Sequence, residues 1–449
     1  MNCIQELSTL NERYDIHPQA ILKTDLLRRG LRFSENALVQ SAHFKEKSYF
    51  IFSFDMVEQK ELTKSERHSA PEEIALNGGP LDFSRTIVSV RLNPNSPYLV
   101  EWKDDHFELY CGEEFLAEVS LNERPAYYKH NLKNGKPVSD IAPTIEWGYL
   151  IYLTAFRVCQ YWGEKEECQF CDINNNYRQQ KRVRSYTGVK DIEDVLEAFE
   201  IINEFDTERH STAYTVTGGS ITSELSGLNE GQFYAQYAQA IEDRFPGRWL
   251  PKAVVQALPL DEVKMLKDSG YQIYHPNYEV WDPKLFSQIC PGKDRYVGRN
   301  EWIKRIVDAA EIFGASNVIP NFVAGIEMSQ PGGFTSVEAA VKSTREGLDF
   351  FMSKGILPRF TVWCVEPNTV LSRTNTEPAP LEYYIHLLQS YREAYIEHAM
   401  PTPPGYGAPG LGKAVFSVSA FMDVLPEERP SQSFDSNTHN YSSDNISPS

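Results

Sequence analysis

Residues 154–177 read TAFRVCQYWGEKEECQFCDINNNY and contain three of the seven cysteines of the chain, Cys159, Cys168 and Cys171. The apolar run YLIYLTA at 149–155 leads into them and predicts a buried strand. In α/β folds, ligand sites form at the carboxyl ends of such strands. The three cysteines are therefore candidate ligands of one site.

Three thiolates at this spacing have few uses in proteins. They can bind zinc with a fourth ligand from elsewhere, or hold three irons of a [4Fe–4S] cluster and leave the fourth iron open. They can also be ordinary thiols in a loop. The pair Cys168 and Cys171 alone is a common pattern, but the upstream Cys159, the aromatic Phe170 and the preceding strand make it more specific.

With Phe170 directly before the last cysteine, the motif resembles that of the radical S-adenosylmethionine (radical SAM) superfamily. The first gap is longer than in the usual motif, with eight residues between Cys159 and Cys168 instead of three. The extra residues include the charged run at 164–167, which we expect to form a solvated bulge. The resemblance implies that Cys159, Cys168 and Cys171 ligate a [4Fe–4S] cluster, with Phe170 beside the cofactor.

The composition indicates a globular protein, since 41% of the 449 residues are hydrophobic and 24% are charged. No apolar run is long enough for a membrane span, and the polar amino terminus lacks a signal core, so we expect a cytoplasmic protein without membrane association. An odd number of cysteines argues against a disulfide framework. We expect Cys111 to be an isolated thiol and Cys290 to be structural.

The formal net charge of −18 repels phosphate backbones, which makes nucleic acid a poor candidate substrate. A basic patch, RQQKRVR at 178–184, follows the cysteines. It is either a solvated, charge-balanced segment or a dock for an acidic electron carrier or an anionic substrate group.

Residues 1–145 form a first region, for which we expect an α+β fold of unknown role. A helical pattern at 21–29 ends at Gly30, and 62–80 is polar and Gly-rich, which predicts a mobile loop. The strand candidates are 49–54, 86–90, 98–102, 107–110 and 115–119.

From 146 to 400 strand and helix patterns alternate, which predicts a parallel sheet of the α/β class. The strand candidates are 149–155, 212–217, 251–256, 271–275, 317–324 and 357–363, and the helix candidates are 191–205, 229–242, 260–268, 299–313, 335–353 and 381–397. Closure into a partial (β/α)6 TIM-type barrel is what the radical SAM resemblance implies. Beyond the barrel, 401–424 is a Pro/Gly-rich extension whose part from 414 can pack on the barrel, and 425–449 is expected to be disordered.

Two later strand ends match places where the family binds S-adenosylmethionine. Gly218, Gly219 and Ser220 stand where the family has a glycine-glycine-glutamate motif facing the methionine amine, with serine in place of the acid. Asn277 and Glu279 fall on the two positions of a biotin-synthase-like motif for the ribose hydroxyls, and alternation puts both on one side of the strand. The alternatives are plain turns at both places.

The fifth strand resembles the family's adenine-binding strand. In this resemblance Val323 touches adenine and Gly325 allows its approach, although apolar residues there can also be barrel core. Just after the sixth strand, Cys364 and Glu366 are candidate catalytic residues, because strand ends on this face line barrel active sites. Cys364 could return a hydrogen atom and Glu366 could bind or deprotonate the substrate. Alternatively, Cys364 is a small buried apolar group and Glu366 caps a turn.

Together these features predict a radical SAM enzyme. The resemblance implies a [4Fe–4S] cluster that cleaves S-adenosylmethionine to a 5′-deoxyadenosyl radical, with an electron from a flavodoxin- or ferredoxin-like donor. That radical abstracts hydrogen from a small-molecule or peptide substrate. The alternative is a non-enzymatic scaffold stabilised by a structural zinc ion.

Overall fold

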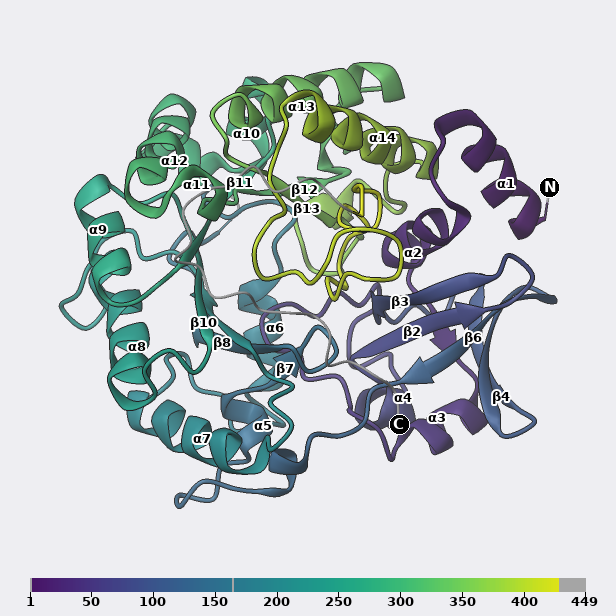
Figure 1. The fold of residues 1–449 in the computed structure, drawn as a ribbon, viewed down its shortest axis with the longest axis horizontal. Helices are drawn as coiled ribbons and strands as arrows, with labels where there is room; N and C mark the ends of the chain where they lie inside the picture. The colour runs from purple at the N-terminus through teal and green to yellow at the C-terminus, as the bar shows by residue number, and fades with distance from the viewer. Residues whose placement is uncertain (1, 164, 428–449) are drawn as a thin grey trace.

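The computed structural model of the chain describes residues 2–163 and 165–427. Figure 1 shows two sheets, a six-stranded one formed by the first part of the chain and a seven-stranded one that curls into a partial barrel. Helices lie along the outer, convex face of the partial barrel. Every helix in the described part of the chain is too short or too polar to cross a membrane.

The six-stranded sheet has the order β1-β4-β5-β6-β2-β3 and is antiparallel except for the β1–β4 pair. The predicted helix at 21–29 is the end of α2, which stops at Gly30 with a φ of 68°. The elements of this region are α1 (Cys3–Tyr14), α2 (Pro18–Arg29), β1 (Arg32–Phe33), α3 (Glu35–Ser41), α4 (Lys64–Ser69), β2 (Glu73–Gly78), β3 (Phe83–Ser89), β4 (Tyr98–Lys103), β5 (His106–Cys111) and β6 (Glu114–Leu121). Four of the five predicted strands correspond to β3, β4, β5 and β6.

Three expectations for this region were wrong. The segment 62–80 is not one loop, because it contains α4, which Thr63 caps, and β2, which pairs with both β3 and β6. Residues 49–54 belong to no strand of either sheet. Cys111 is not isolated, since it ends β5 and forms a disulfide with Cys3. The disulfide and the pairing of β2 with β6 involve partners distant in sequence, whereas the Thr63 cap of α4 is a local signal that the prediction missed.

The partial barrel has the strand order β13-β12-β11-β10-β9-β8-β7. Strands β8 to β13 are parallel neighbours, and β7 adds to β8 in the antiparallel direction. The strands are β7 (Thr144–Ile145), β8 (Leu150–Phe156), β9 (Ala213–Gly218), β10 (Leu250–Val255), β11 (Ile273–Glu279), β12 (Asn321–Ala324) and β13 (Arg359–Val362). The six predicted strands are thus β8 to β13, and the mixed α/β fold with a partial (β/α)6 barrel is confirmed.

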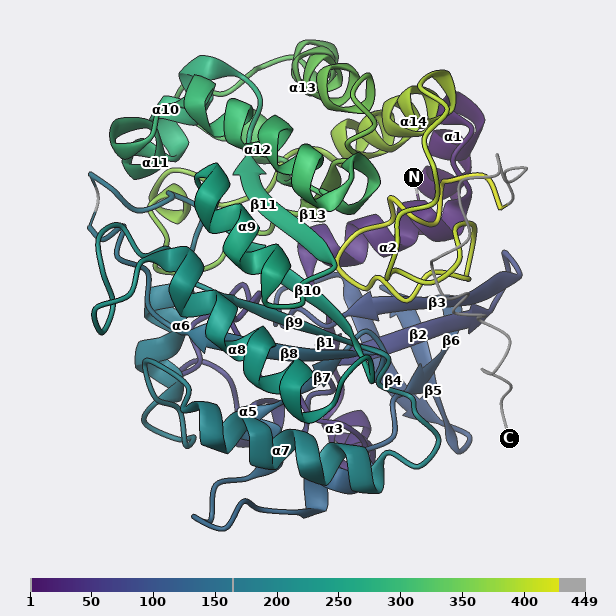
Figure 2. The ribbon, with the colours of Figure 1, turned by 60° about the vertical axis from the view of Figure 1, so that its left-hand side comes forward.

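The six predicted barrel helices are also present. They are α7 (Ile192–Phe205), α8 (Glu230–Arg244), α9 (Leu260–Asp268), α12 (Arg299–Phe313), α13 (Val337–Met352) and α14 (Leu381–Glu397). Figure 2 shows α7, α8 and α9 lying along the outer face of the strands. Shorter helices that the patterns did not predict are α5 (Val138–Ile141), α6 (Ile173–Gln180), α10 (Pro283–Ile289) and α11 (Pro291–Tyr296).

Two segments connect β13 with β7 and β8 across the open side of the barrel. The segment 48–55 does so near the strand ends that carry the cysteines: the Phe50 carbonyl accepts from Thr154 and Arg157, both at 2.7 Å, and the Phe54 amide donates to Glu366 at 2.6 Å. The segment 405–418 does so at another place: the Val362 amide donates to the Val418 carbonyl at 3.2 Å, and the Ser417 amide donates to Glu146, the residue after β7, at 2.6 Å. The first region therefore contributes the segment 48–55 to the barrel's wall.

The carboxyl-terminal extension follows the prediction in part. Residues 401–424 contain no helix or strand, and the stretch from Ala414 to Val424 packs against the core. Leu425 is buried as well, although it was assigned to the disordered tail. The rest of that tail, from 428 onward, lies outside the described residues.

Candidate cofactor and substrate site

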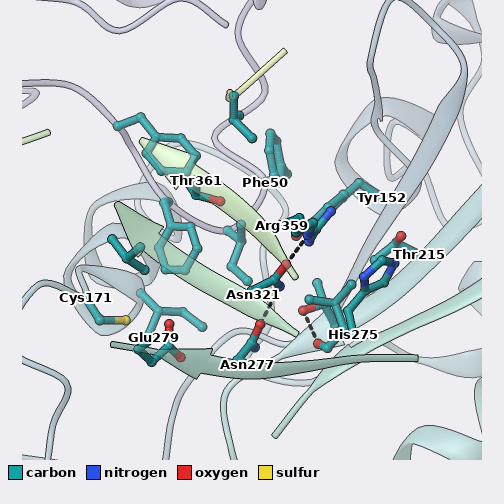
Figure 3. A pocket seen from close by; sticks show the side chains of 18 of the residues that line it. Phe50, Tyr152, Cys171, Thr215, His275, Asn277, Glu279, Asn321, Arg359 and Thr361 are labelled. Atoms are coloured by element: carbon teal, nitrogen blue, oxygen red, sulfur yellow. Dashed lines mark hydrogen bonds between the residues drawn. The ribbon is translucent and has the colours of Figure 1, made fainter. Parts of the chain in front are cut away.

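A cavity of about 200 Å³ lies inside the partial barrel. Strands β8 to β13 contribute its inner wall, and the segments 48–55 and 405–418 contribute the side that the barrel leaves open. Figure 3 shows Cys171 and Glu279 at one end of this cavity, Arg359, Tyr152 and His275 at the other, and Asn277 and Asn321 between them. The cavity thus has a cysteine end and a cationic end.

All three cysteines of the motif line the cysteine end, as does Phe170. The loop is held by the Cys159 amide, which donates to Asn174 Oδ1 at 3.0 Å, and by the Cys171 amide, which donates to the Cys168 carbonyl at 3.0 Å. Within the described residues no three Cys, His, Asp or Glu side chains converge on a point that could hold a single metal ion. A zinc site requires such convergence, whereas thiolates that bind separate irons of a cluster stand further apart.

The surroundings of the three sulfurs differ in their effect on the thiol pKa. Burial, with Cys168 nearby, raises the pKa of Cys159 to about 12, while the backbone amides of Ser220 and Tyr161 work in the other direction. A hydrogen bond with the Cys290 thiol lowers the pKa of Cys168, and the Lys293 ammonium lowers it further. Burial likewise raises the pKa of Cys171 well above its ordinary value. Only the surroundings of Cys168 thus favour the thiolate in the protein alone, and ligation of the other two thiols requires that the metal displace their protons. Cys290 itself is fully buried, as expected for a structural residue.

The paired glycines serve the cysteine loop. A Cβ added to Gly219 would lie 2.2 Å from the Val158 carbonyl oxygen and 2.4 Å from Cys159 Cα, so a side chain there would displace the loop. The Ser220 carbonyl accepts from the Gln160 amide at 3.0 Å. Gly218, Gly219 and Ser220 all line the cavity. The close approach of Gly218 and Gly219 to the backbone of 156–159 is a second reason for glycine at these two positions, besides the predicted approach to a ligand.

Asn277 and Glu279 both line the cavity, although the register between β11 and β12 shifts between them, so that the alternation assumed for this pair is not regular. Asn277 Oδ1 accepts from Asn321 Nδ2 at 2.6 Å, and Arg359 Nε donates to Asn321 Oδ1 (Figure 3). These three residues are register partners on β11, β12 and β13. The orientation of Asn277 is therefore fixed by a hydrogen-bonded row that crosses three strands.

Glu279 has a φ of 86°, a left-handed conformation that is uncommon for glutamate. Its Oε1 accepts from Lys293 Nζ at 2.5 Å. Burial opposes the charge on Lys293, but Glu279 and the nearby cysteines outweigh it and raise the pKa of this ammonium. One carboxylate oxygen of Glu279 is thus engaged, and Lys293 links the predicted ribose position to Cys168.

The fifth strand agrees with the prediction at only one of its two positions. Val323 lines the cavity, whereas Gly325 is not among the described lining residues. A Cβ on Gly325 would lie 2.1 Å from Tyr384 Oη, and its φ of 109° also excludes most other residues. Packing against Tyr384 therefore accounts for this glycine.

Cys364 and Glu366 line the cavity, and so does Trp363. Strict alternation would separate Trp363 from the other two, but β13 ends at Val362 and the irregular backbone beyond it removes the alternation. Burial raises the pKa of Cys364 to about 12. Burial and the neighbouring carboxyl of Asp172 raise the pKa of Glu366 well above its ordinary value.

Glu366 also has a structural role. Its Oε1 accepts from Ser53 Oγ at 3.0 Å and from the Phe54 amide at 2.6 Å. Through these bonds it fastens the segment 48–55 to the end of β13.

The prediction missed four residues of the cationic end, namely Lys252, His275, Arg359 and Tyr406. Lys252 is a charged residue in the otherwise apolar strand LPKAVV, a pattern that signals an inward-facing functional group. Tyr406 lies in the Pro/Gly-rich extension, where no periodicity could reveal it.

Two charged segments near the cysteines are partly structural. In the predicted solvated bulge at 164–167, residue 164 lies outside the described residues. Glu166 pairs with Arg295 at 3.4 Å and accepts from Tyr296 Oη at 2.8 Å, so its carboxylate is not simply solvated. In the basic patch, Arg184 is largely buried and pairs with Asp140 at 3.4 Å. Lys181 and Arg182 are exposed, so only part of the patch is a solvated surface.

No family model matches the chain. A curated relative, the bacteriochlorophyllide c C-7(1)-hydroxylase of Chlorobaculum limnaeum, is 23% identical over 382 residues, which cover 79% of this chain and 87% of the relative.

Solved structures with similarity to the chain have low TM-scores. HydG, a maturase of the [FeFe]-hydrogenase, has a TM-score of 0.40 and 14% identity, covering 56% of this chain and 51% of its own. Methylornithine synthase has a TM-score of 0.39 and 10% identity, covering 59% and 71%. Coproporphyrinogen III oxidase from Escherichia coli, a radical SAM enzyme by its description, has a TM-score of 0.30 and 12% identity, covering 42% and 41%. The chain thus aligns with about half of HydG and less than half of the oxidase.

Proposed function

We propose that this protein is a radical SAM enzyme that acts on a substrate bound inside its partial barrel. One observation carries the proposal: the three cysteines of the motif line the same cavity as Gly218–Ser220, Asn277 and Val323, each of which was predicted from the sequence to contact S-adenosylmethionine. Residues from four strand ends thus meet where the cofactors are expected.

In this proposal Cys159, Cys168 and Cys171 hold a [4Fe–4S] cluster at the cysteine end. When bound, the cluster and S-adenosylmethionine supply a radical that can remove a hydrogen atom from an unactivated carbon. The chain's own residues orient that chemistry. Asn277, held by Asn321, offers hydrogen bonds to the ribose, Val323 offers an apolar wall to the adenine, and Phe170 covers the cluster side.

Apolar side chains on the side that the barrel leaves open fit radical chemistry, which requires exclusion of water and oxygen. They are Phe50, Phe52 and Phe54 of the first region and Phe416 and Val418 of the extension. The curated relative is named a hydroxylase at a carbon position, and such a reaction begins with breaking a C–H bond. We extend to this chain only that class of reaction, functionalisation of a carbon centre in a small-molecule or peptide substrate.

The enzyme requires an electron donor, for which a flavodoxin- or ferredoxin-like protein is proposed. The zinc scaffold is not favoured, because the described cysteines and histidines do not converge on one ion. The net charge of −18 continues to disfavour a nucleic-acid substrate. The cytoplasmic location remains a prediction.

Anaerobic reconstitution with iron and sulfide tests the proposal. We expect a brown protein with about four irons per chain, which forms 5′-deoxyadenosine from S-adenosylmethionine after reduction with dithionite. A colourless, zinc-loaded protein that forms no 5′-deoxyadenosine would contradict it.

A further inference from the structure

Two cationic side chains face the end of the cavity away from the cysteines. Lys252 comes from β10 and Arg359 from the start of β13, and both line the cavity. They share Tyr406 as a neighbour: Lys252 Nζ lies 4.9 Å and Arg359 Cζ 5.5 Å from the centre of its ring. Two positive groups from different strands are therefore brought together around one aromatic side chain.

Arg359 carries a permanent charge, whereas burial and repulsion from Arg359 lower the pKa of Lys252 to about 7, so that an anion bound beside it favours its ammonium form. Among the described residues no carboxylate oxygen lies within 4.0 Å of Lys252 Nζ or of the Arg359 guanidinium, although the structure has many other ion pairs. The nearby acid, Glu146, accepts from the Ser417 amide at 2.6 Å, and burial beside Glu73 raises its pKa to about 8. It is therefore mostly protonated at neutral pH. Buried charges are costly unless they are paired, so the arrangement is suited to an incoming anion.

Both cations keep hydrogen-bond donors in reserve. Lys252 donates to the Gly405 carbonyl, which uses one of its three N–H groups. Arg359 donates through Nε to Asn321 and through Nη1 to Tyr406 Oη at 2.6 Å, which uses two of its five. The protein bonds thus fix both heads and leave donors for a ligand, and an arginine fork matches carboxylate geometry.

Much of the remaining wall is apolar, with the hydroxyl groups of Thr215, Thr217 and Thr361 among its polar atoms. Phe50, Phe54, Leu150, Val415 and Phe416 line the cavity between its ends or on its open side. His275 is fully buried, and burial with two neighbouring cations lowers its pKa well below 6.5, so it adds no charge. A ligand that matches these surfaces has an apolar body and one anionic group.

We infer that Lys252 and Arg359 form a carboxylate-binding subsite, and that the substrate is an amphiphilic carboxylic acid whose acid group is held here while its apolar body extends towards the cysteines. The inference rests on the proposed function, because it assigns the substrate class to the same cavity. It also explains why Asn321 bonds to Arg359 on one side and to Asn277 on the other, since one row then positions both substrate and cofactor groups.

Binding of acids and their primary amides tests the subsite. The probes are phenylbutyrate, indolepropionate and octanoate, each compared with its amide by calorimetry on the full chain. We expect at least one acid to bind about tenfold more tightly than its amide. Lys252→Met and Arg359→Gln should each abolish this preference, Arg359→Lys should retain part of it, and Lys264→Met, which removes an exposed lysine of α9, should leave it unchanged.

The inference is overturned if no acid is preferred over its amide, including the case in which none binds. It is also overturned if Lys252→Met and Arg359→Gln both keep the preference. Unchanged circular dichroism of each variant shows that it is folded. Formation of 5′-deoxyadenosine by the wild type is measured separately. If the wild type forms it but prefers no acid, the subsite is refuted and the proposed function stands. If it prefers acids but forms no 5′-deoxyadenosine, the proposed function is refuted and the subsite stands.

Discussion

Asn277 and Asn321 are register partners on the neighbouring strands β11 and β12, and the Asn321 amide donates to Asn277 Oδ1 at 2.6 Å. This bond leaves the Asn277 NH2 group as a donor and fixes its direction. Because Asn321 is held in turn by Arg359, the predicted ribose contact is pre-organised before any ligand arrives.

We expect Asn277→Ala to weaken binding of S-adenosylmethionine without changing the iron content. Loss of one or two ribose hydrogen bonds should cost roughly 1–3 kcal/mol, or about 5- to 150-fold in affinity. Anaerobic calorimetry on reconstituted protein measures this change. Asn317→Ala is the matched control, because Asn317 donates to the Phe313 carbonyl away from the cavity. An unchanged dissociation constant would remove Asn277 from the site.

Cys168→Ala should abolish cluster binding while the barrel stays folded, since a cluster held by three cysteines has no spare protein ligand. Iron analysis and circular dichroism after anaerobic reconstitution report the two properties separately. Cys290→Ala is the control, because this buried thiol lies beside Cys168 but does not line the cavity. If Cys168→Ala retained about four irons, the ligand assignment would be wrong, whereas Cys290→Ala should keep them because it removes a hydrogen bond to Cys168 but no ligand.

Glu366→Gln should leave S-adenosylmethionine cleavage intact and reduce substrate conversion by about 100-fold or more. Glutamine can still accept from Ser53 and the Phe54 amide, so the segment 48–55 should stay in place. Comparing 5′-deoxyadenosine with product separates the two steps. The control is Glu327→Gln, a buried glutamate bonded to the Gly325 amide outside the cavity lining. Normal product formation by Glu366→Gln would leave Glu366 a purely structural role.

Lys252 should make stability depend on pH. Burial first, then repulsion from Arg359, lowers its pKa from 10.5 to about 7, while Glu146 raises it. The folded state thus binds this proton less tightly than the unfolded state does. The resulting destabilisation is complete below about pH 7 and disappears as the pH rises towards 10.5.

We therefore expect Lys252→Met to stabilise the protein by about 1–4 kcal/mol near neutral pH, with a smaller gain towards pH 10.5. His275 titrates below this window, and ionisation of Glu146 within it favours the ammonium, so both leave the sign unchanged. Denaturant unfolding at several pH values measures the gain, and Lys264→Met should show none. A pH-independent gain would refute the assignment to Lys252.

Much of the barrel was predictable because its signals are local. The periodicity of α7 and α13 and the apolar runs of β8 and β10 are properties of contiguous residues. The cysteine motif was equally visible, since the spacing of Cys159, Cys168 and Cys171 is a property of one loop. The sequence likewise placed Asn277 and Glu279 on one side of a strand, and both line the cavity, but the register of β11 shifts between them, so regular alternation is not what brings Glu279 there.

The tertiary structure decided everything that depends on two distant segments meeting. Whether Trp363 or Cys364 faces the cavity could not follow from alternation, because β13 ends before them. The roles of Gly219 and Gly325 became clear only from the neighbours that their absent side chains would strike. Lys252 lies more than a hundred residues before Arg359 and Tyr406 in the sequence. Only closure of the barrel by the extension brings the two basic side chains to the Tyr406 ring. Local pattern determines which elements form, whereas long-range packing determines which side chains share a cavity, because the energy of that contact is absent until the chain has folded.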